Sequence, residues 1–318
     1  MNKKILCITG PTAIGKSSLA MNFCRKKTSK NGHIISMDAA QIYRGIDIAS
    51  AKPSKTELAE IPHHLINICS PDEYYSAAKF LSDVKRLLIE IEELKGVPII
   101  TGGTMMYLHR LTQGINSVPE IPKEEVKKVE EMGREDGWEE LHSELMKIDP
   151  FQASKIGKRD SQRITRQLSV WKYTGRTLRS WQNEKNAEKP IPFLKIIALV
   201  PSDQDYLHQR IKKRLKAMIN NGLMDEAKSL KNSYKIARNS PSSKLVGIRQ
   251  ALAFLDKEIS YSEFVYRTEV ATKQLAKRQL TWLNKFKDVT FVDPVKTTLN
   301  QQISICASDS FLGTTSPR

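Results

Sequence analysis

The residues Gly10-Pro11-Thr12-Ala13-Ile14-Gly15-Lys16-Ser17 fit the pattern G-x-x-x-x-G-K-[ST], which is typical of a loop that binds phosphate groups. The apolar residues 4–9 before it predict a short buried strand, and residues 17–23 after it predict a helix. This context argues against a chance match in a turn. Glycines let the backbone turn its N–H groups towards an anion, and the N-terminus of the helix adds positive potential. We expect Lys16 to supply a mobile cation and the Ser17 hydroxyl to bind a phosphate-bound Mg²⁺.

Composition fits a cytoplasmic globular protein. The 318 residues are 40% hydrophobic, which is enough for one large domain or two modest ones. No apolar run reaches the length of a signal peptide or a membrane span. The four cysteines are scattered and form no C-x-x-C pair, so we expect neither a disulfide framework nor a zinc site.

The net charge of +16 is unevenly distributed. Residues 1–118 carry 15 basic and 10 acidic side chains, residues 119–150 carry 5 and 11, and residues 151–318 carry 31 and 14. Residues 151–182 alone hold eight basic side chains and one acidic one, Asp160. A solvated helix face is the ordinary explanation of such a run. The shortage of compensating carboxylates favours a polyanionic partner, with nucleic acid the leading candidate.

Further short apolar runs predict a parallel sheet. We expect strands at 33–38, 65–68, 96–101, 193–200 and 289–293, alternating with helices. Asp38 ends the second strand, so it should face the same crevice as the phosphate loop, unless it only caps a turn. The strand at 96–101 ends in Gly102-Gly103-Thr104, where a nucleotide hydrolase usually has an acidic residue. ATP hydrolysis is therefore disfavoured.

The chain also suggests an insertion. We expect the first part of an α/β core at 1–117, an inserted helical domain at 118–190, the core resumed with basic helices at 191–295, and a loosely ordered polar tail at 296–318. The pair His63-His64 has no third metal ligand at a useful spacing, so a packed or hydrogen-bonded role is expected.

Several stretches together resemble one family, the tRNA dimethylallyltransferases of bacterial type. They are GPTAIGKS (10–17), SMDAAQIYRGIDIASAKP (36–53), PHHLINICSP (62–71), GGTMMY (102–107), DPFQASKI with RDSQRITR (149–166) and TKQLAKRQLTW (272–282). The resemblance implies an α/β fold, a parallel-sheet core like that of the P-loop NTPases with helices on its flanks and an inserted all-α tRNA-binding domain.

The resemblance implies transfer of a dimethylallyl group from dimethylallyl diphosphate to N6 of the adenosine at tRNA position 37. Asp38 matches the family's general base, and Thr104 and Lys16 match residues at the same centre. Residues Gly10, Pro11, Thr12, Ala13, Ile14, Gly15, Lys16 and Ser17, together with Arg214, would bind the diphosphate, with one Mg²⁺ at Ser17 as cofactor.

The resemblance also implies contacts with the anticodon stem-loop of tRNA. The matching positions are Asp38, Ala39, Ala40, Gln41, Thr104, Lys127, Gln162, Arg163, Ile164, Thr165, Arg166, Lys244, Gly247, Arg249, Lys273, Gln274, Lys277 and Arg278. No membrane and no obligate protein partner is implied, and nothing demands more than a monomer.

Some positions depart from the family pattern. Ala39 stands where serine is common, Ala49-Ser50 replaces Gly-Thr, Ile248 replaces a tyrosine, and Lys273 replaces an arginine, which gives up a bidentate fork. They affect the expected rate and tRNA selectivity more than the reaction type. Three alternatives remain open: a P-loop nucleotide kinase or NTPase, a prenyltransferase acting on free adenine nucleotides, and a non-catalytic RNA-binding relative.

Overall fold

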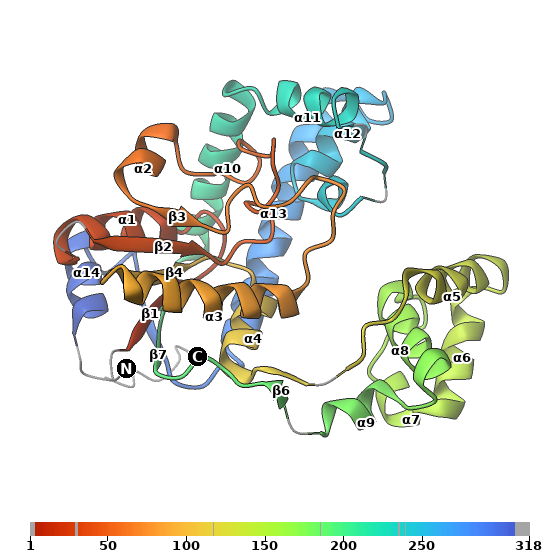
Figure 1. Ribbon diagram of the computed structural model, residues 1–318. Helices are drawn as coiled ribbons and strands as arrows, with labels where there is room; N and C mark the ends of the chain where they lie inside the picture. Colours follow the sequence, from red (N-terminus) through yellow and green to blue (C-terminus); the bar gives the residue numbers. More distant parts are fainter. Residues whose placement is uncertain are drawn as a thin grey trace. The chain divides into compact units, whose positions relative to one another are not determined.

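The chain forms two compact units, the first made of Met1–Thr112 with Ile191–Arg318 and the second of Gln113–Pro190. They are seen in the computed structural model, which describes residues 4–28, 31–116, 118–184, 186–234, 236–238 and 240–308 (Figure 1). The second unit interrupts the first in sequence, and it begins five residues before the insertion that the sequence indicates.

A six-stranded parallel sheet is the centre of the first unit. Its strands, in the order in which they lie side by side, are β3 (His63–His64), β2 (Gly32–Ser36), β4 (Val97–Thr101), β1 (Ile5–Thr9), β7 (Leu194–Leu199) and β8 (Val289–Val292). Because β2, β4 and β1 are neighbours and parallel, the loops that follow them meet at one edge of the sheet. These loops carry Asp38, Gly102-Gly103-Thr104 and the phosphate loop.

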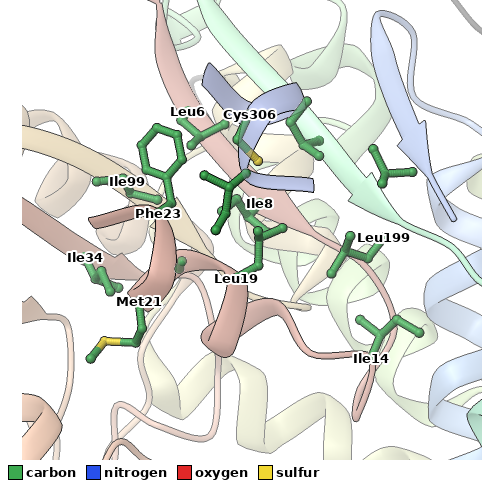
Figure 2. Close-up of a cluster of buried hydrophobic side chains, with 14 of the residues drawn as sticks. Leu6, Ile8, Ile14, Leu19, Met21, Phe23, Ile34, Ile99, Leu199 and Cys306 are labelled. Atoms are coloured by element: carbon green, nitrogen blue, oxygen red, sulfur yellow. The ribbon is translucent and has the colours of Figure 1, made fainter. Parts of the chain in front are cut away.

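Helix α1 (Lys16–Lys27) and the C-terminal helix α14 (Leu299–Ala307) pack together in the main hydrophobic core. Leu6, Ile8 and Ile99 of the strands meet Leu19 of α1 and Cys306 of α14 there (Figure 2). Strand side chains alternate between faces, so Ile35 and Ile100 point to the opposite face of the sheet, where α3 (Ala77–Glu93) lies along it (Figure 1).

The first unit also holds α2 (Lys55–Glu60), α4 (Met105–Gln113) and the 3₁₀ turn η1 (Ser242–Lys244). A second core beside the sheet is built mainly by α10 (Gln204–Asn220), α11 (Leu223–Asn232), α12 (Ile248–Leu255) and α13 (Tyr261–Leu283). Ile248, where the family has a tyrosine, is fully buried here among Ile42, Ile46 and Phe264. The substitution therefore changes packing in this core. Helix α13 starts with the capping box of Ser260 and Glu263.

The second unit is mainly helical. It holds α5 (Lys123–Glu135), α6 (Trp138–Ile148), α7 (Pro150–Ala153), α8 (Ser161–Thr174) and α9 (Leu178–Gln182), and its core includes Val129, Leu141 and Leu168. Strands β5 (Ile115–Asn116) and β6 (Asn186–Glu188) pair antiparallel at the two ends of the inserted segment. Two- and three-residue strands leave too short a pattern to be predicted from sequence.

Two local expectations were wrong. Residues 65–68 do not form a strand, because Leu65 and Asn67 adopt left-handed backbone angles with φ of 60° and 58°, and the strand is the preceding His63–His64 pair. The tail was expected to be loosely ordered, but its residues 299–307 form helix α14. This helix is capped by Thr298 with Gln301 and buries Ile303 in the core. Residues 309–318 lie outside the described part of the chain.

The sequence also drew attention to the four cysteines and to the paired histidines. All four cysteines are buried and free. Nδ1 of His33 lies 3.1 Å from Nε2 of His64, so the histidines of β2 and β3 are hydrogen-bonded to each other. Within the described ranges, no helix combines the length and apolarity that crossing a bilayer requires.

Candidate active site

The phosphate loop joins the end of β1 to the start of α1. Gly10 has φ of 143°, and a Cβ there would lie 2.5 Å from the carbonyl oxygen of Leu199 on the neighbouring strand. Gly15, with φ of 110°, precedes the helix. Ile14 is buried in the main core, which anchors the loop between its two glycines. The backbone angles therefore explain the glycines at positions 10 and 15, and packing explains the apolar residue at position 14.

Two cations and a carboxylate converge on this loop. Nζ of Lys16 donates to the Pro11 carbonyl at 2.7 Å, and Nη1 of Arg214, from α10, donates to Oγ1 of Thr12 at 3.1 Å. Burial lowers the pKa of Lys16 to about 8; the charge of Asp38 raises it in part, and that of Arg214 lowers it further. Burial also lowers the pKa of Arg214, against the opposite effect of Asp38. The cations are desolvated and ready for an anion.

Asp38 lies just beyond β2 and faces the cavity. Its Oδ1 accepts a hydrogen bond from the backbone N–H of Ala40 at 2.8 Å, so it also caps the turn that follows. Oγ1 of Thr104 accepts from the N–H of Ala39 at 2.9 Å. Asp38 therefore has a second carboxylate oxygen for which no hydrogen bond within the described residues is recorded, and Thr104 fixes the turn on which it stands.

The glycines after β4 allow close contact with that turn. A Cβ at Gly102 would lie 2.0 Å from the carbonyl oxygen of Met37, so no larger residue fits there. The N–H of Thr104 donates to the same carbonyl at 3.2 Å. The strand therefore ends in glycine and not in an acidic residue because the turn packs closely against Met37.

These groups surround one cavity of about 490 Å³. Its polar wall includes Thr12, Lys16, Asp38, Thr104 and Arg214, and its remaining wall is largely apolar, with Ile211, Leu215, Met218, Leu245, Met105 and Trp282. A ligand with an anionic end and a small apolar end matches this division. Ser17 also lines the cavity.

Sequence reasoning assigned no role to two residues that hold segments bordering the cavity. Glu226, near the start of α11, accepts from the N–H groups of Asp47, Ile48 and Ala49 at 2.6, 2.6 and 2.9 Å. The carbonyl of Ala49 in turn lies 3.5 Å from Nη2 of Arg214. Arg210 donates through Nε to the Ala13 carbonyl at 2.7 Å. Its spacing of four from Arg214 was the only signal for it in the sequence.

The residues implied to contact tRNA are mostly at the surface. In the second unit Lys127, Gln162, Arg163 and Arg166 are exposed, as are Lys244, Arg249, Gln274, Lys277 and Arg278 in the first, whereas Lys273 is partly buried and pairs with Glu269 at 2.6 Å. Gly247 is buried and precedes α12 with φ of 94°. The side chains of Ile164 and Thr165 are buried within the helical unit.

A metal ion would find few protein ligands here. No cluster of three or more histidine, cysteine, aspartate or glutamate side chains occurs in the ranges that the structure describes. The Ser17 hydroxyl borders the cavity beside Lys16. This fits Mg²⁺, which keeps several waters and binds proteins largely through one or two oxygens and a substrate's phosphates.

Comparison with known proteins identifies the family. The IPP transferase family model matches residues 41–286. The chain belongs to this family. A tRNA dimethylallyltransferase of Nitrosomonas eutropha is 40% identical over 297 residues, covering 93% of this chain and 92% of its own. That of Coxiella burnetii strain Dugway is 39% identical over 306 residues, with 95% and 97% covered.

Solved IPP transferase structures share the fold. The full-length tRNA isopentenylpyrophosphate transferase of Bacillus halodurans has a TM-score of 0.68 at 30% identity, covering 96% of this chain and 95% of its own. A eukaryotic dimethylallyltransferase described as acting on tRNA has a TM-score of 0.79 at 24% identity, covering 96% and 78%, and supports the fold alone. The parallel-sheet α/β class predicted from the sequence is confirmed.

Proposed function

We propose that this protein transfers a dimethylallyl group from dimethylallyl diphosphate to N6 of the adenosine at tRNA position 37, next to the anticodon, in the cytoplasm. One observation carries the proposal. A single cavity has the phosphate loop with Lys16 and Arg214 on one side, Asp38 on another, and an apolar wall between α10 and α13. It suits an allylic diphosphate together with an adenine base whose N6 amino group must lose a proton.

The reaction breaks the bond between the allylic carbon and the diphosphate oxygen, and forms a bond from the same carbon to N6. The departing diphosphate takes the electron pair, so negative charge grows where Lys16, Arg214, the Thr12 hydroxyl and the loop N–H groups gather. N6 loses a proton as its new bond forms, and Asp38 is the carboxylate that accepts it. Thr104 holds the Asp38 turn through Ala39.

Mg²⁺, when bound at Ser17, would supply further positive charge to the diphosphate oxygens. Lys16 donates to the Pro11 carbonyl, and exchanging that partner for a phosphate oxygen costs little hydrogen bonding. The desolvated ammonium and guanidinium then gain a partner of opposite charge.

The helical unit supports a polynucleotide substrate over a free nucleotide. Arg163 and Arg166 are exposed on α8, and the ring of Phe151 is about half exposed with Nζ of Lys155 at 3.5 Å and the guanidinium of Arg179 at 4.0 Å from its centre. Unpaired RNA bases are commonly recognised by stacking with basic contacts to the backbone. Phe151 is not among the tRNA-contact residues predicted from the sequence.

The test is incubation of the purified protein with dimethylallyl diphosphate, Mg²⁺ and unmodified tRNA that reads UNN codons, followed by mass spectrometry of the nucleosides. We expect the mass of adenosine 37 to rise by one dimethylallyl group, and a large excess of AMP not to compete. No gain in mass would refute the proposal, whereas efficient competition by AMP would favour a nucleotide prenyltransferase. ATP turnover without prenylation would favour a kinase or NTPase.

A further inference from the structure

Gln279 of α13 joins two sides of the cavity through its amide group. Its Oε1 accepts a hydrogen bond from the backbone N–H of Thr12 at 2.8 Å, and its Nε2 donates to the carbonyl of Gly103 at 2.8 Å. These partners lie 267 and 176 residues away in the sequence. The side chain is only 8% exposed and lies in the cavity wall.

The two bonds require an amide in one orientation. An acceptor must face the N–H of Thr12 and a donor must face the carbonyl of Gly103, and no ordinary apolar or ionised side chain of this size provides both. Gly103 leaves room for the amide, because a Cβ there would lie 2.6 Å from Nε2 of Gln279 and 3.4 Å from Nζ of Lys16. The glycine and the glutamine are therefore matched.

The linked segments carry the opposite halves of the proposed chemistry. Thr12 belongs to the phosphate loop, and its hydroxyl accepts from Arg214. Gly103 precedes Thr104, whose hydroxyl accepts from the N–H of Ala39, the residue that follows Asp38. A short chain of hydrogen-bonded residues thus runs from Arg214 through Thr12 and Gln279 to the turn that carries the carboxylate.

We propose that Gln279 is a positioning residue that fixes the distance between the diphosphate subsite and Asp38. The inference rests on the proposed function and deepens it. Without this link Thr12 is no longer tied to the Gly103-Thr104 turn. The hydrogen bonds of Gly102 with Ile8 and Thr9 still hold that turn to the end of β1, but the loop at Thr12 can shift, and the allylic carbon and N6 lose their alignment. A misplacement of about 1 Å in such a site costs on the order of 10²-fold in rate.

The first test compares Gln279→Met with Gln302→Met. Methionine keeps the length of the side chain and removes both amide functions. Gln302 is a matched control, since it is also 8% exposed and its Nε2 donates to a carbonyl, that of Thr297 at 3.1 Å, on α14 away from the cavity. We expect Gln279→Met to lower kcat about 10- to 100-fold, with each KM changed less than about threefold, and Gln302→Met to leave kcat unchanged.

The second test is the pH profile of Gln279→Glu, which also serves if the methionine variant fails to fold. A protonated carboxyl can accept from Thr12 and donate to Gly103, whereas an ionised one cannot donate and repels the carbonyl. We expect the ratio of variant to wild-type kcat to rise as the pH falls from 8 to 6. A structural role alone would change the melting temperature and leave this ratio flat.

The outcomes separate the two proposals. If the wild-type protein transfers no dimethylallyl group, the proposed function fails. If it does, an unchanged kcat in Gln279→Met, or a raised KM with full kcat, would overturn the positioning role and leave the function standing. Equal losses of kcat in Gln279→Met and Gln302→Met would also overturn it.

Discussion

The cavity of the first unit and the surface of the second use positive charge in different ways. In the cavity, Lys16 and Arg214 are desolvated and feel the charge of the Asp38 carboxylate. On the helical unit the basic side chains are partly or largely exposed, and several form surface ion pairs: Arg159 with Glu139, Arg163 with Asp160, Lys172 with Glu144 and Arg176 with Glu184.

This difference has a physical consequence. Surface ion pairs contribute about 0–1 kcal/mol each and are screened by salt, so a polyanion can replace the carboxylates at little cost. Desolvated charges in a cavity interact strongly with a ligand and are screened much less. We therefore expect changes in the cavity to affect the chemical step, and changes on the helical unit to affect tRNA affinity and its dependence on salt.

The largest effect is expected for Asp38→Asn. The amide cannot accept the proton from N6, so kcat should fall by about 10²- to 10⁴-fold while tRNA affinity stays within a few-fold. Single-turnover rates and filter binding of tRNA measure the two quantities. A variant that binds tRNA poorly yet turns over normally would assign Asp38 to recognition.

The second-largest effect is expected for Lys16→Met. Removal of one cation from the developing diphosphate charge should lower kcat/KM for dimethylallyl diphosphate by about 10²- to 10³-fold, at any salt concentration that the tRNA complex tolerates. Steady-state kinetics at two ionic strengths check this. A loss that disappears at high salt would mean that Lys16 acts only by long-range attraction.

The pH dependence of the wild-type activity should show the titration of Lys16. Its pKa is lowered to about 8, so below that pH the ammonium is charged and above it the charge is lost. We expect kcat/KM for dimethylallyl diphosphate to fall about tenfold per pH unit above the pKa, and the remaining activity of Lys16→Met to lack this decline. A wild-type profile that is flat to pH 9.5 would contradict the assignment.

The smallest effect is expected on the helical unit. Arg163→Gln combined with Arg166→Gln should weaken tRNA binding several-fold and reduce the slope of log affinity against log salt by about one to two, with kcat at saturating tRNA unchanged. Lys85→Gln with Lys95→Gln, on and just after α3, serves as a control of equal charge change. A fall in kcat would mean that these arginines act in the chemical step, and the contrast between the two units would not hold.

The sequence predicted the parts of the site that are local in the chain. The phosphate loop was recognisable because strand, glycines and helix follow one another, and Asp38 because it ends an apolar run. Residues 65–68 were misjudged because an apolar run does not reveal left-handed backbone angles at Leu65 and Asn67. Helix α14 was missed because its polar composition hides the buried apolar residues Ile303 and Cys306.

Non-local contacts could not be predicted from the sequence. Glu226 holds the loop of Asp47 from about 180 residues away, and Gln279 reaches Thr12 from 267 residues away. Glu226 lies outside the stretches that resemble the family, and Gln279 lies in the stretch 272–282, which does not by itself signal a contact with Thr12. The family resemblance supplied the reaction and most site residues, while the structure supplied the links that hold those residues in place.

The central claim is that the phosphate loop holds a leaving group and not an energy source. The direct measurement is the stoichiometry of diphosphate release and adenosine modification in one reaction with tRNA, in the presence and absence of ATP. We predict one diphosphate released for each modified adenosine, with ATP neither required nor consumed. Modification that depends on ATP hydrolysis, or diphosphate release without modification, would contradict the account.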